Sequence, residues 1–186
     1  MAQDGPLRGP GVSVKTAPAQ RDESVATSAI AYAIHESPIG ELLLVAHETA
    51  LTRLHVLAGR YVPTVQADWR PDRSHPVLTL ARRELDAYFA RALRTFAVPI
   101  APQGTIFQRR VWTALTGIPY GATRTYAQQA HAIGQPAAVR AVGAANGRNP
   151  ISIIVPCHRV IGADGAMTGY AGGLGAKRLL LDLEAA

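Results

Sequence analysis

The sequence predicts a small α/β domain followed by a mainly α-helical domain that contains a helix-turn-helix. Short apolar segments separated by turn residues fill the stretch 30–57, which is typical of paired strands. After Thr105, apolar residues recur at helical spacing instead. A proline-containing stretch at 99–104 separates the two patterns and indicates a domain boundary. The predicted division is an extension at 1–28, an α/β domain at 29–100 and a helical domain at 101–186.

The composition is that of a globular protein. Of the 186 residues, 48% are hydrophobic and 17% are charged, and no apolar run is long enough to span a bilayer. Residues 1–28 differ, because they are rich in Pro, Gly, Ser, Ala and Gln and lack the apolar core of a signal peptide. We therefore expect a disordered extension at 1–28 and a protein of the cytoplasm.

The predicted α/β domain consists of a small sheet and one helix. Three short apolar segments predict its strands, at 31–34, 42–45 and 51–56. The connections between them are too short for crossover helices, so we expect an antiparallel sheet. The polar stretch 58–75 contains two prolines and predicts a loop, and an apolar stripe predicts a helix from Pro76 to about Leu93 that packs on the sheet. The scattered histidines of these strands lack the pattern of a metal site, and we expect no metal.

The second half predicts four helices. Thr105 is a candidate N-cap for the first, which carries apolar residues at helical spacing. A second helix is predicted at 123–133 and a third from Pro136 to about 145, joined by a turn that contains Gly134. Two helices joined in this way fit a helix-turn-helix, although many packed helix pairs share the pattern. Gly147 is expected to end the third helix with positive φ, and a last helix is predicted at 174–184.

One face of the predicted third helix carries a single long cation among small residues. Around Arg140 the neighbours at helical spacing are Pro136, Ala137, Gly143 and Ala144, with Gly147 just beyond. Such a face allows close approach to another backbone, which is either a nucleic acid groove or a neighbouring helix. Residues 104–186 hold eight Lys and Arg against three Asp and Glu, and a basic surface of this kind favours a polyanionic partner.

The one cysteine of the chain, Cys157, is followed directly by His158 and lies between two apolar runs. Two interpretations are open at this point: a buried apolar residue, or a nucleophile whose thiolate is favoured by His158 and Arg159. Glu184 falls on the apolar side of the last predicted helix, where a carboxylate is costly unless it is paired. It either frays at the chain end or orients a histidine as the third member of a Cys–His–Glu set.

The segment 154–161, Ile-Val-Pro-Cys-His-Arg-Val-Ile, resembles the active-site signature of the O6-alkylguanine-DNA alkyltransferases, also called methylated-DNA–protein-cysteine methyltransferases. The resemblance is dense over 104–184 and loose over 30–100. Its further matches are Gly104-Thr105, Phe107-Gln108, Val111-Trp112, Ile118-Pro119, Arg140-Ala141-Val142-Gly143, Asn149-Pro150, Gly169-Tyr170 and Gly172-Gly173. It implies a ribonuclease-H-like fold for the N-terminal domain.

The resemblance implies that Cys157 takes an alkyl group from O6 of guanine, or less readily from O4 of thymine, in one irreversible step. His158 would act as the base through a water, and Glu184 would orient it. The implied catalytic set is Cys157, His158, Glu184, Asn149, Tyr126 and Lys177. The implied DNA-binding set is Arg140, Tyr126, Pro136, Ala137, Gly143, Ala144 and Gly147. The implied base pocket is Val160, Tyr170, Ala171, Gly172, Pro156 and Arg159.

The implied partner is double-stranded DNA that contains alkylated guanine or thymine, bound by a monomer in the minor groove with the target base flipped out. Arg140 would fill the vacated stack. No cofactor is implied, and the cysteine ligands of the zinc that some relatives bind are missing. Ala171 stands where several relatives carry a hydroxyl, but the family contact to O6 there comes from the main chain, so function is expected to survive.

Three other functions compete with alkyl transfer at this point. They are a non-catalytic binder of damaged DNA, a helix-turn-helix regulator in which Cys157 is a core residue, and a cysteine hydrolase. The first class lacks the nucleophilic cysteine, which is present here. A hydrolase would need an acyl pocket and repeated turnover.

Overall fold

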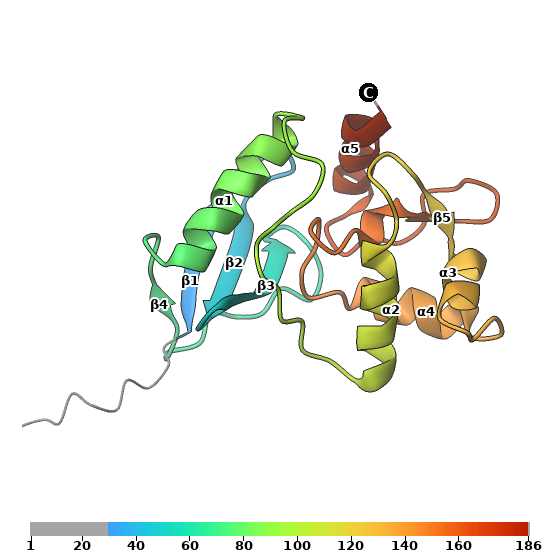
Figure 1. Ribbon diagram of the computed structural model, residues 1–186, viewed down its shortest axis with the longest axis horizontal. Coiled ribbons are helices and arrows are strands. Elements are labelled where there is room, and N and C mark those ends of the chain that lie inside the picture. Colours follow the sequence, from blue (N-terminus) through green and yellow to red (C-terminus); the bar gives the residue numbers. More distant parts are fainter. Residues whose placement is uncertain (1–29, 186) are drawn as a thin grey trace, which may run out of the picture.

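The computed structural model describes residues 30–185, so the extension predicted at 1–28 lies outside the described residues. Within that range a four-stranded sheet and helix α1 lie on one side of the molecule, and helices α2 to α5 lie on the other (Figure 1). The α/β half followed by a helical half is the predicted fold class, and it is confirmed. None of the helices in the described range is long and apolar enough to cross a membrane.

The three predicted strands are present as β1 (Ala31–His35), β2 (Leu42–His47) and β3 (Ala50–Val56). They pair antiparallel as predicted, in the order β3-β2-β1-β4. The prediction of a plain loop at 58–75 was wrong in one detail, because β4 (Arg70–Pro71) pairs in parallel with β1. A two-residue strand that contains proline carries almost no sequence signal, and proline is tolerated there because β4 is an edge strand.

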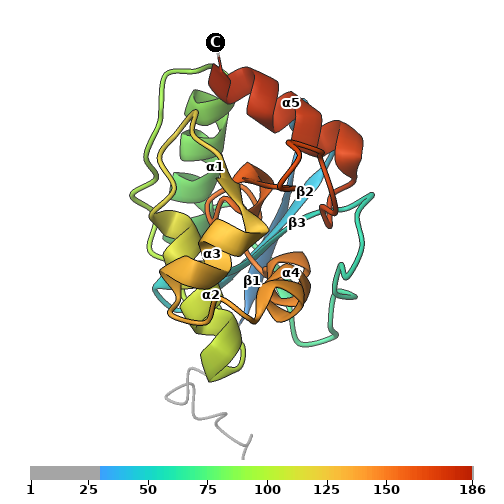
Figure 2. The same cartoon turned by 90° about the vertical axis from the view of Figure 1, so that its right-hand side faces the viewer.

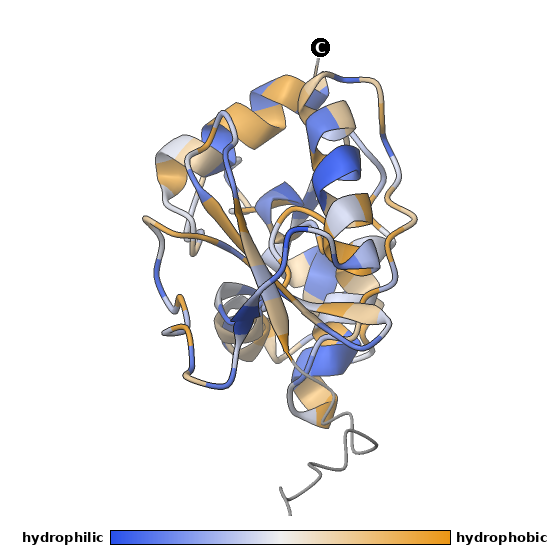
Figure 3. Ribbon diagram, turned by 90° about the vertical axis from the view of Figure 1, so that its left-hand side faces the viewer, coloured by the Kyte–Doolittle hydropathy of each residue, from blue (hydrophilic) through white to orange (hydrophobic). Residues whose placement is uncertain are grey.

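Helix α1 (Pro76–Phe89) covers one face of the sheet. Its apolar stripe packs toward the sheet, as the spacing predicted. Figure 3 shows hydrophilic residues recurring along the helix, whereas β2 is largely hydrophobic. The helix ends earlier than Leu93, because Arg91 takes a left-handed φ of 60° and turns the chain. Glu84, which is buried, accepts hydrogen bonds from the backbone N–H groups of Ala97 and Val98 and so ties α1 to the following connection.

The predicted helices of the second half are all present, with corrected ends. Helix α2 (Ile106–Thr116) begins at a capping box whose N-cap is Thr105, as predicted. Helix α3 (Tyr126–Ala132) begins later than 123, because β5 (Arg124–Thr125) pairs in parallel with β6 (Val160–Ile161). Helix α5 (Leu174–Ala185) closes the domain.

The recognition helix of the helix-turn-helix is α4 (Val139–Gly147), which packs against α2 and α3. The prediction that it starts at Pro136 was wrong, because Pro136 and Ala137 belong to the turn between α3 and α4. The end of the helix was predicted at Asn146-Gly147, with Gly147 able to take positive φ. Gly147 is indeed the last helical residue, but it does not take positive φ, and Arg148 caps the helix at φ −101°. Figure 2 shows α3 and α4 on the face that is turned to the viewer.

The segment that leads to Cys157 is anchored to the edge of the sheet. Leu54 on the outer strand β3 donates its backbone N–H to Pro150 O and accepts from the N–H of Ser152. The bridge between Leu54 and Ile151 thereby extends the sheet toward the helical half, and one continuous apolar core spans both halves. The sheet thus supports the segment that carries Cys157. Because the core is continuous, the division of the chain into two domains near residue 100 stays a prediction.

Candidate active site

Cys157 lies on a single 3-10 turn, η1 (Cys157–Arg159), directly after the segment anchored to β3. Its side chain is buried, and Asn149 Nδ2 donates to Cys157 Sγ at 3.1 Å and to Val155 O at 2.8 Å. Burial raises the pKa of the Cys157 thiol to about 11, and the Asn149 hydrogen bond and the nearby Lys177 oppose that shift. The resting protein therefore holds a neutral thiol in a site that already contains groups able to stabilise its anion.

The backbone before Cys157 is strained. Ile153 has a φ of 72°, and a β-branched residue rarely adopts this left-handed conformation. The strain persists because Ile153 is buried and the chain is fixed on both sides, by β3 and by Asn149. Strained backbone that is held in this way clusters at functional sites, which agrees with a catalytic role for Cys157.

His158, the residue after Cys157, contacts Glu184. Its Nε2 lies 2.9 Å from Glu184 Oε1, and both side chains are buried. Burial lowers the pKa of His158, whereas hydrogen bonds from His158 and Arg159 hold the pKa of Glu184 well below its usual range. Because the carboxylate only accepts, a neutral imidazole must donate from Nε2, which leaves Nδ1 as an acceptor. That atom has no hydrogen-bond partner within residues 30–185.

Arg159 belongs to the same network and not to the base pocket in which it was predicted. Its Nε and Nη2 donate to the two carboxylate oxygens of Glu184, each at 2.8 Å, and Nη1 donates to Ile118 O. The bidentate geometry follows from the planar guanidinium, which matches a carboxylate. Arg159 therefore neutralises Glu184 inside the protein, whereas the family resemblance implied a place for it in the base pocket.

Tyr88 is a member of the site that sequence reasoning missed. It lies on α1 in the sheet half, is fully buried, and donates from its hydroxyl to Glu184 Oε1 at 2.6 Å. In the sequence it falls on the apolar stripe of α1, where a tyrosine looks like any core aromatic. The sheet half thus contributes a hydrogen bond directly to the carboxylate that holds His158.

Replacing Tyr88 with phenylalanine should lower the free energy of unfolding by about 1–3 kcal/mol, because a buried hydrogen bond to a carboxylate is lost. The reaction of the Cys157 thiol should also slow, since Glu184 loses one of the donors that fix its position. Urea denaturation and single-turnover rates measure the two effects. Tyr32→Phe on β1 is the matched control, and a Tyr88→Phe protein that resembles it in both measurements would contradict the assignment.

Lys177 on α5 is buried, although lysine is rarely so. Its Nζ donates to Val160 O at 2.6 Å and to Thr168 O at 2.8 Å. Burial lowers the pKa of Lys177, and the electrostatic attraction between its ammonium group and an ionised Cys157 opposes that shift. The residue therefore fastens the loop after β6 to the cysteine segment and places a cation near Cys157.

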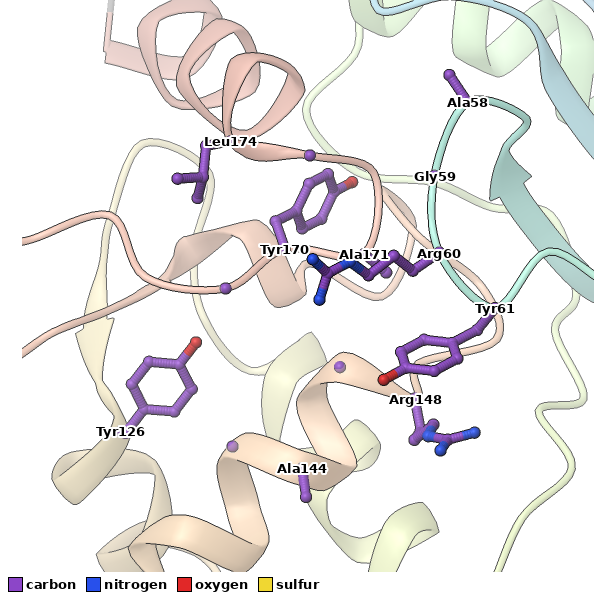
Figure 4. Close-up of a pocket in the computed structure, with 14 residues that line it drawn as sticks. Ala58, Gly59, Arg60, Tyr61, Tyr126, Ala144, Arg148, Tyr170, Ala171 and Leu174 are labelled. Atoms are coloured by element: carbon purple, nitrogen blue, oxygen red, sulfur yellow. The ribbon is translucent and has the colours of Figure 1, made fainter.

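A cavity of about 710 Å³ lies next to this network, because Tyr170, whose ring packs against that of His158, is part of its lining (Figure 4). Cys157 is not among the lining residues. One wall is the small-residue side of α4 together with Tyr126, whose hydroxyl donates to Thr168 O at 3.2 Å. A second wall is Tyr170 and Ala171, and a third is the loop 58–61 from the sheet half. Of the residues predicted to contact DNA or base, the lining includes Tyr126, Gly143, Ala144, Gly147, Tyr170 and Ala171. It does not include Pro156, Val160, Gly172, Arg159, Arg140, Pro136 or Ala137.

Comparison with known proteins identifies the family. The ribonuclease-like domain of 6-O-methylguanine DNA methyltransferase matches residues 30–102, and the DNA-binding domain of the same family matches 106–186. The chain belongs to this family. The methylated-DNA–protein-cysteine methyltransferase of Methanosarcina barkeri is 52% identical over 82% of this chain and 96% of its own length. A Mycobacterium tuberculosis relative bears the same name and is 52% identical over 83% of this chain and 92% of its own length.

Solved structures support the same assignment. The crystal structure of Mycobacterium tuberculosis OGT in complex with DNA has a TM-score of 0.77 and 52% identity, covering 83% of this chain and 92% of that one. The O6-methylguanine-DNA methyltransferase of Pyrococcus kodakaraensis is 21% identical with a TM-score of 0.61, covering 84% of this chain and 99% of that one. This second likeness concerns the fold alone. The methyltransferase fold therefore accounts for both halves of the chain.

The exposed side of α4 in this methyltransferase family member agrees with the predicted helix faces. Arg140, Ala144 and the turn residues Pro136 and Ala137 are exposed, whereas Val142 and Ala145 are buried. Trp112 on α2 fixes the helix from behind by donating Nε1–H to the backbone carbonyl of Ala145 at 2.9 Å. The guanidinium of Arg140 makes no ion pair with any residue in the described range and is free to contact a partner.

Proposed function

We propose that this protein repairs DNA by transferring the alkyl group of O6-alkylguanine, and less readily of O4-alkylthymine, to Cys157 in a single turnover. The observation that carries the proposal is the buried thiol held by Asn149 beside a neutral histidine that Glu184 orients. The family relationship supports the reaction type, because the relatives are named for it.

The first step is removal of the Cys157 proton by the unprotonated Nδ1 of His158. Within the described residues Nδ1 has no hydrogen-bond partner, so no direct hydrogen bond joins it to the thiol, and we propose a bridging water as the route. The imidazolium that results is stabilised by the ionised Glu184 at 2.9 Å. Glu184 therefore holds His158 in the tautomer whose Nδ1 can accept a proton, and it stabilises the positive charge of the resulting imidazolium.

The charges around Cys157 favour its thiolate. Arg159 and Glu184 neutralise each other, whereas Lys177 is held by two carbonyl oxygens and faces no carboxylate partner in residues 30–185. A buried cation without a counter-charge stabilises an anion that forms next to it. Burial raises the pKa of the thiol, and Lys177 reduces the cost of forming its thiolate.

The thiolate then attacks the alkyl carbon, so that the S–C bond forms as the C–O6 bond breaks. The electron pair of that bond stays on the guanine, which takes up a proton and remains in the DNA strand as unmodified guanine. Tyr126 and Lys177 are the proposed donors toward the base. The product is a thioether, and because its S–C bond is not cleaved by thiols or by water, each molecule acts once.

The target atom lies inside the duplex, so the nucleotide must rotate out of the stack before it can enter the cavity. We propose that α4 enters the minor groove, where its small residues allow close approach, and that Arg140 occupies the space of the flipped base. The protein is proposed to act as a monomer in the cytoplasm, with residues 29–100 and 101–186 as its two domains. Binding should be salt-sensitive and largely independent of sequence.

The decisive test uses duplex DNA with a labelled O6-methylguanine. We expect at most one equivalent of label per protein, on Cys157, and none on Cys157→Ala. Transfer that persists in Cys157→Ala would remove Cys157 as the nucleophile, and repeated turnover would indicate a hydrolase. Binding without any transfer would leave the non-catalytic damage binder as the function.

A further inference from the structure

The third wall of the cavity, the loop 58–61, comes from the sheet half. It is hydrogen-bonded to the loop between β6 and α5, which contains Ala171 and is called the active-site loop below. Arg60 donates its backbone N–H to Ala171 O at 2.7 Å. A Cβ at Gly59 would lie 2.6 Å from that same oxygen, so the close approach requires glycine. The loop 58–61 is therefore held in place by its backbone, independently of what its side chains do.

A second contact joins this loop to the recognition helix. Tyr61 takes a left-handed φ of 61°, and its ring lies 4.0 Å from the guanidinium carbon of Arg148, which caps α4. Cation–π contacts of this kind hold a guanidinium over an aromatic face. The sheet half, the active-site loop and α4 thus meet at the rim of the cavity.

The side chain of Arg60 extends from this loop across the cavity, above Ala171 and between Tyr170 and Tyr61 (Figure 4). It is exposed, and it makes no hydrogen bond or ion pair with any of the described residues. A smaller adjoining cavity of about 240 Å³ adds Arg53 and shares Arg60 with the first. Neither cavity has an acidic residue in its lining, and the charged side chains of both linings are all arginines.

We propose that Arg60 binds a phosphodiester of the damaged strand beside the flipped nucleotide. This inference rests on the proposed function and adds a contact from the sheet half to it. A base that enters the cavity leaves its own phosphates at the rim, across from the small-residue side of α4. A planar guanidinium with no protein partner suits such a phosphate, because it donates two parallel hydrogen bonds.

The test compares Arg60→Gln and Arg60→Lys with Arg83→Gln, which removes an equal charge from the exposed side of α1. Binding of an O6-methylguanine duplex is measured by fluorescence anisotropy in a Cys157→Ala background at several KCl concentrations. Loss of one phosphate contact should lower the slope of log Kd against log[KCl] by about 0.9 in Arg60→Gln. Arg60→Lys and Arg83→Gln should keep the parent slope.

Repair rates in the Cys157 protein give the second readout. Between 50 and 200 mM KCl, the defect of Arg60→Gln on duplex DNA should shrink by about 3–4-fold, as one lost phosphate contact requires. Its reaction with free O6-benzylguanine, which has no phosphate, should stay within about twofold of the parent. The inference would be overturned if Arg60→Gln kept the parent's slope of log Kd against log[KCl]. It would also be overturned if the variant lost as much rate on free O6-benzylguanine as on duplex DNA. If the proposed function itself is wrong, the parent protein with Cys157 will transfer no alkyl group from the DNA, and this outcome is distinct from a defect of Arg60→Gln.

Discussion

Replacing Glu184 with glutamine is expected to lower the free energy of unfolding by about 3–5 kcal/mol, because it leaves the Arg159 cation buried without its counter-charge. Alkyl transfer should fall by about 10²-fold or more, since His158 loses the group that orients it and stabilises its charged form. Urea denaturation and single-turnover repair assays measure the two losses. The exposed Glu41 provides the control, and Glu41→Gln should stay within about 0.5 kcal/mol.

The same carboxylate should dominate the acid sensitivity of the fold. The pKa of Glu184 is held below its ordinary value by His158 and Arg159, so its contribution to stability is fully present above about pH 4.3 and is lost as the pH falls through the folded pKa. The stability difference between the parent and Glu184→Gln should shrink by about 1.4 kcal/mol per pH unit below that point. A difference that is constant from pH 5 to pH 3 would contradict the depressed pKa.

The fold was predictable where local pattern and final structure agree. The three strands alternate or run apolar between turn residues, and Thr105 with Gln108 forms the capping box that its sequence suggests. The misses arise where tertiary contacts override local preference. Thr123 to Thr125 looked helical, but Arg124 and Thr125 pair with the strand that follows the active-site turn. Nothing in the local sequence of these residues predicts that they pair with β6.

The site was predictable as chemistry but not as geometry. Cys157 and His158 could be chosen because a cysteine beside a histidine and an arginine is a candidate nucleophile, and because they match the family signature. Glu184 could be chosen because a carboxylate on an apolar helix face is costly unless it is paired. The family resemblance implied a place for Arg159 in the base pocket, and no sequence pattern indicated that its guanidinium contacts Glu184. Tyr88 was missed because its hydroxyl acts across 96 residues of sequence, and only the packing of α1 against the helical half brings it there.

Arg140→Ala is expected to slow repair in duplex DNA by about 10–100-fold, which corresponds to about 1.4–2.7 kcal/mol out of an unstacking cost of a few kcal/mol. The reaction with free O6-benzylguanine should change by less than about twofold, because no stack has to be opened. Single-turnover rates on the two substrates measure the contrast. Arg83→Ala on α1 removes the same charge from an exposed helix position and should leave both rates unchanged.

A third substrate separates base flipping from simple electrostatic attraction to the DNA. An O6-methylguanine in single-stranded DNA keeps its phosphates but has no duplex stack to leave, so the cost that Arg140 is proposed to offset is largely absent. If the guanidinium fills the vacated stack, Arg140→Ala should be close to the parent on this substrate and impaired on the duplex. If Arg140 only attracts phosphates, the loss should be similar on both and should disappear together as salt rises. Equal impairment on single-stranded and duplex DNA would therefore reassign Arg140 from insertion into the stack to binding of the backbone.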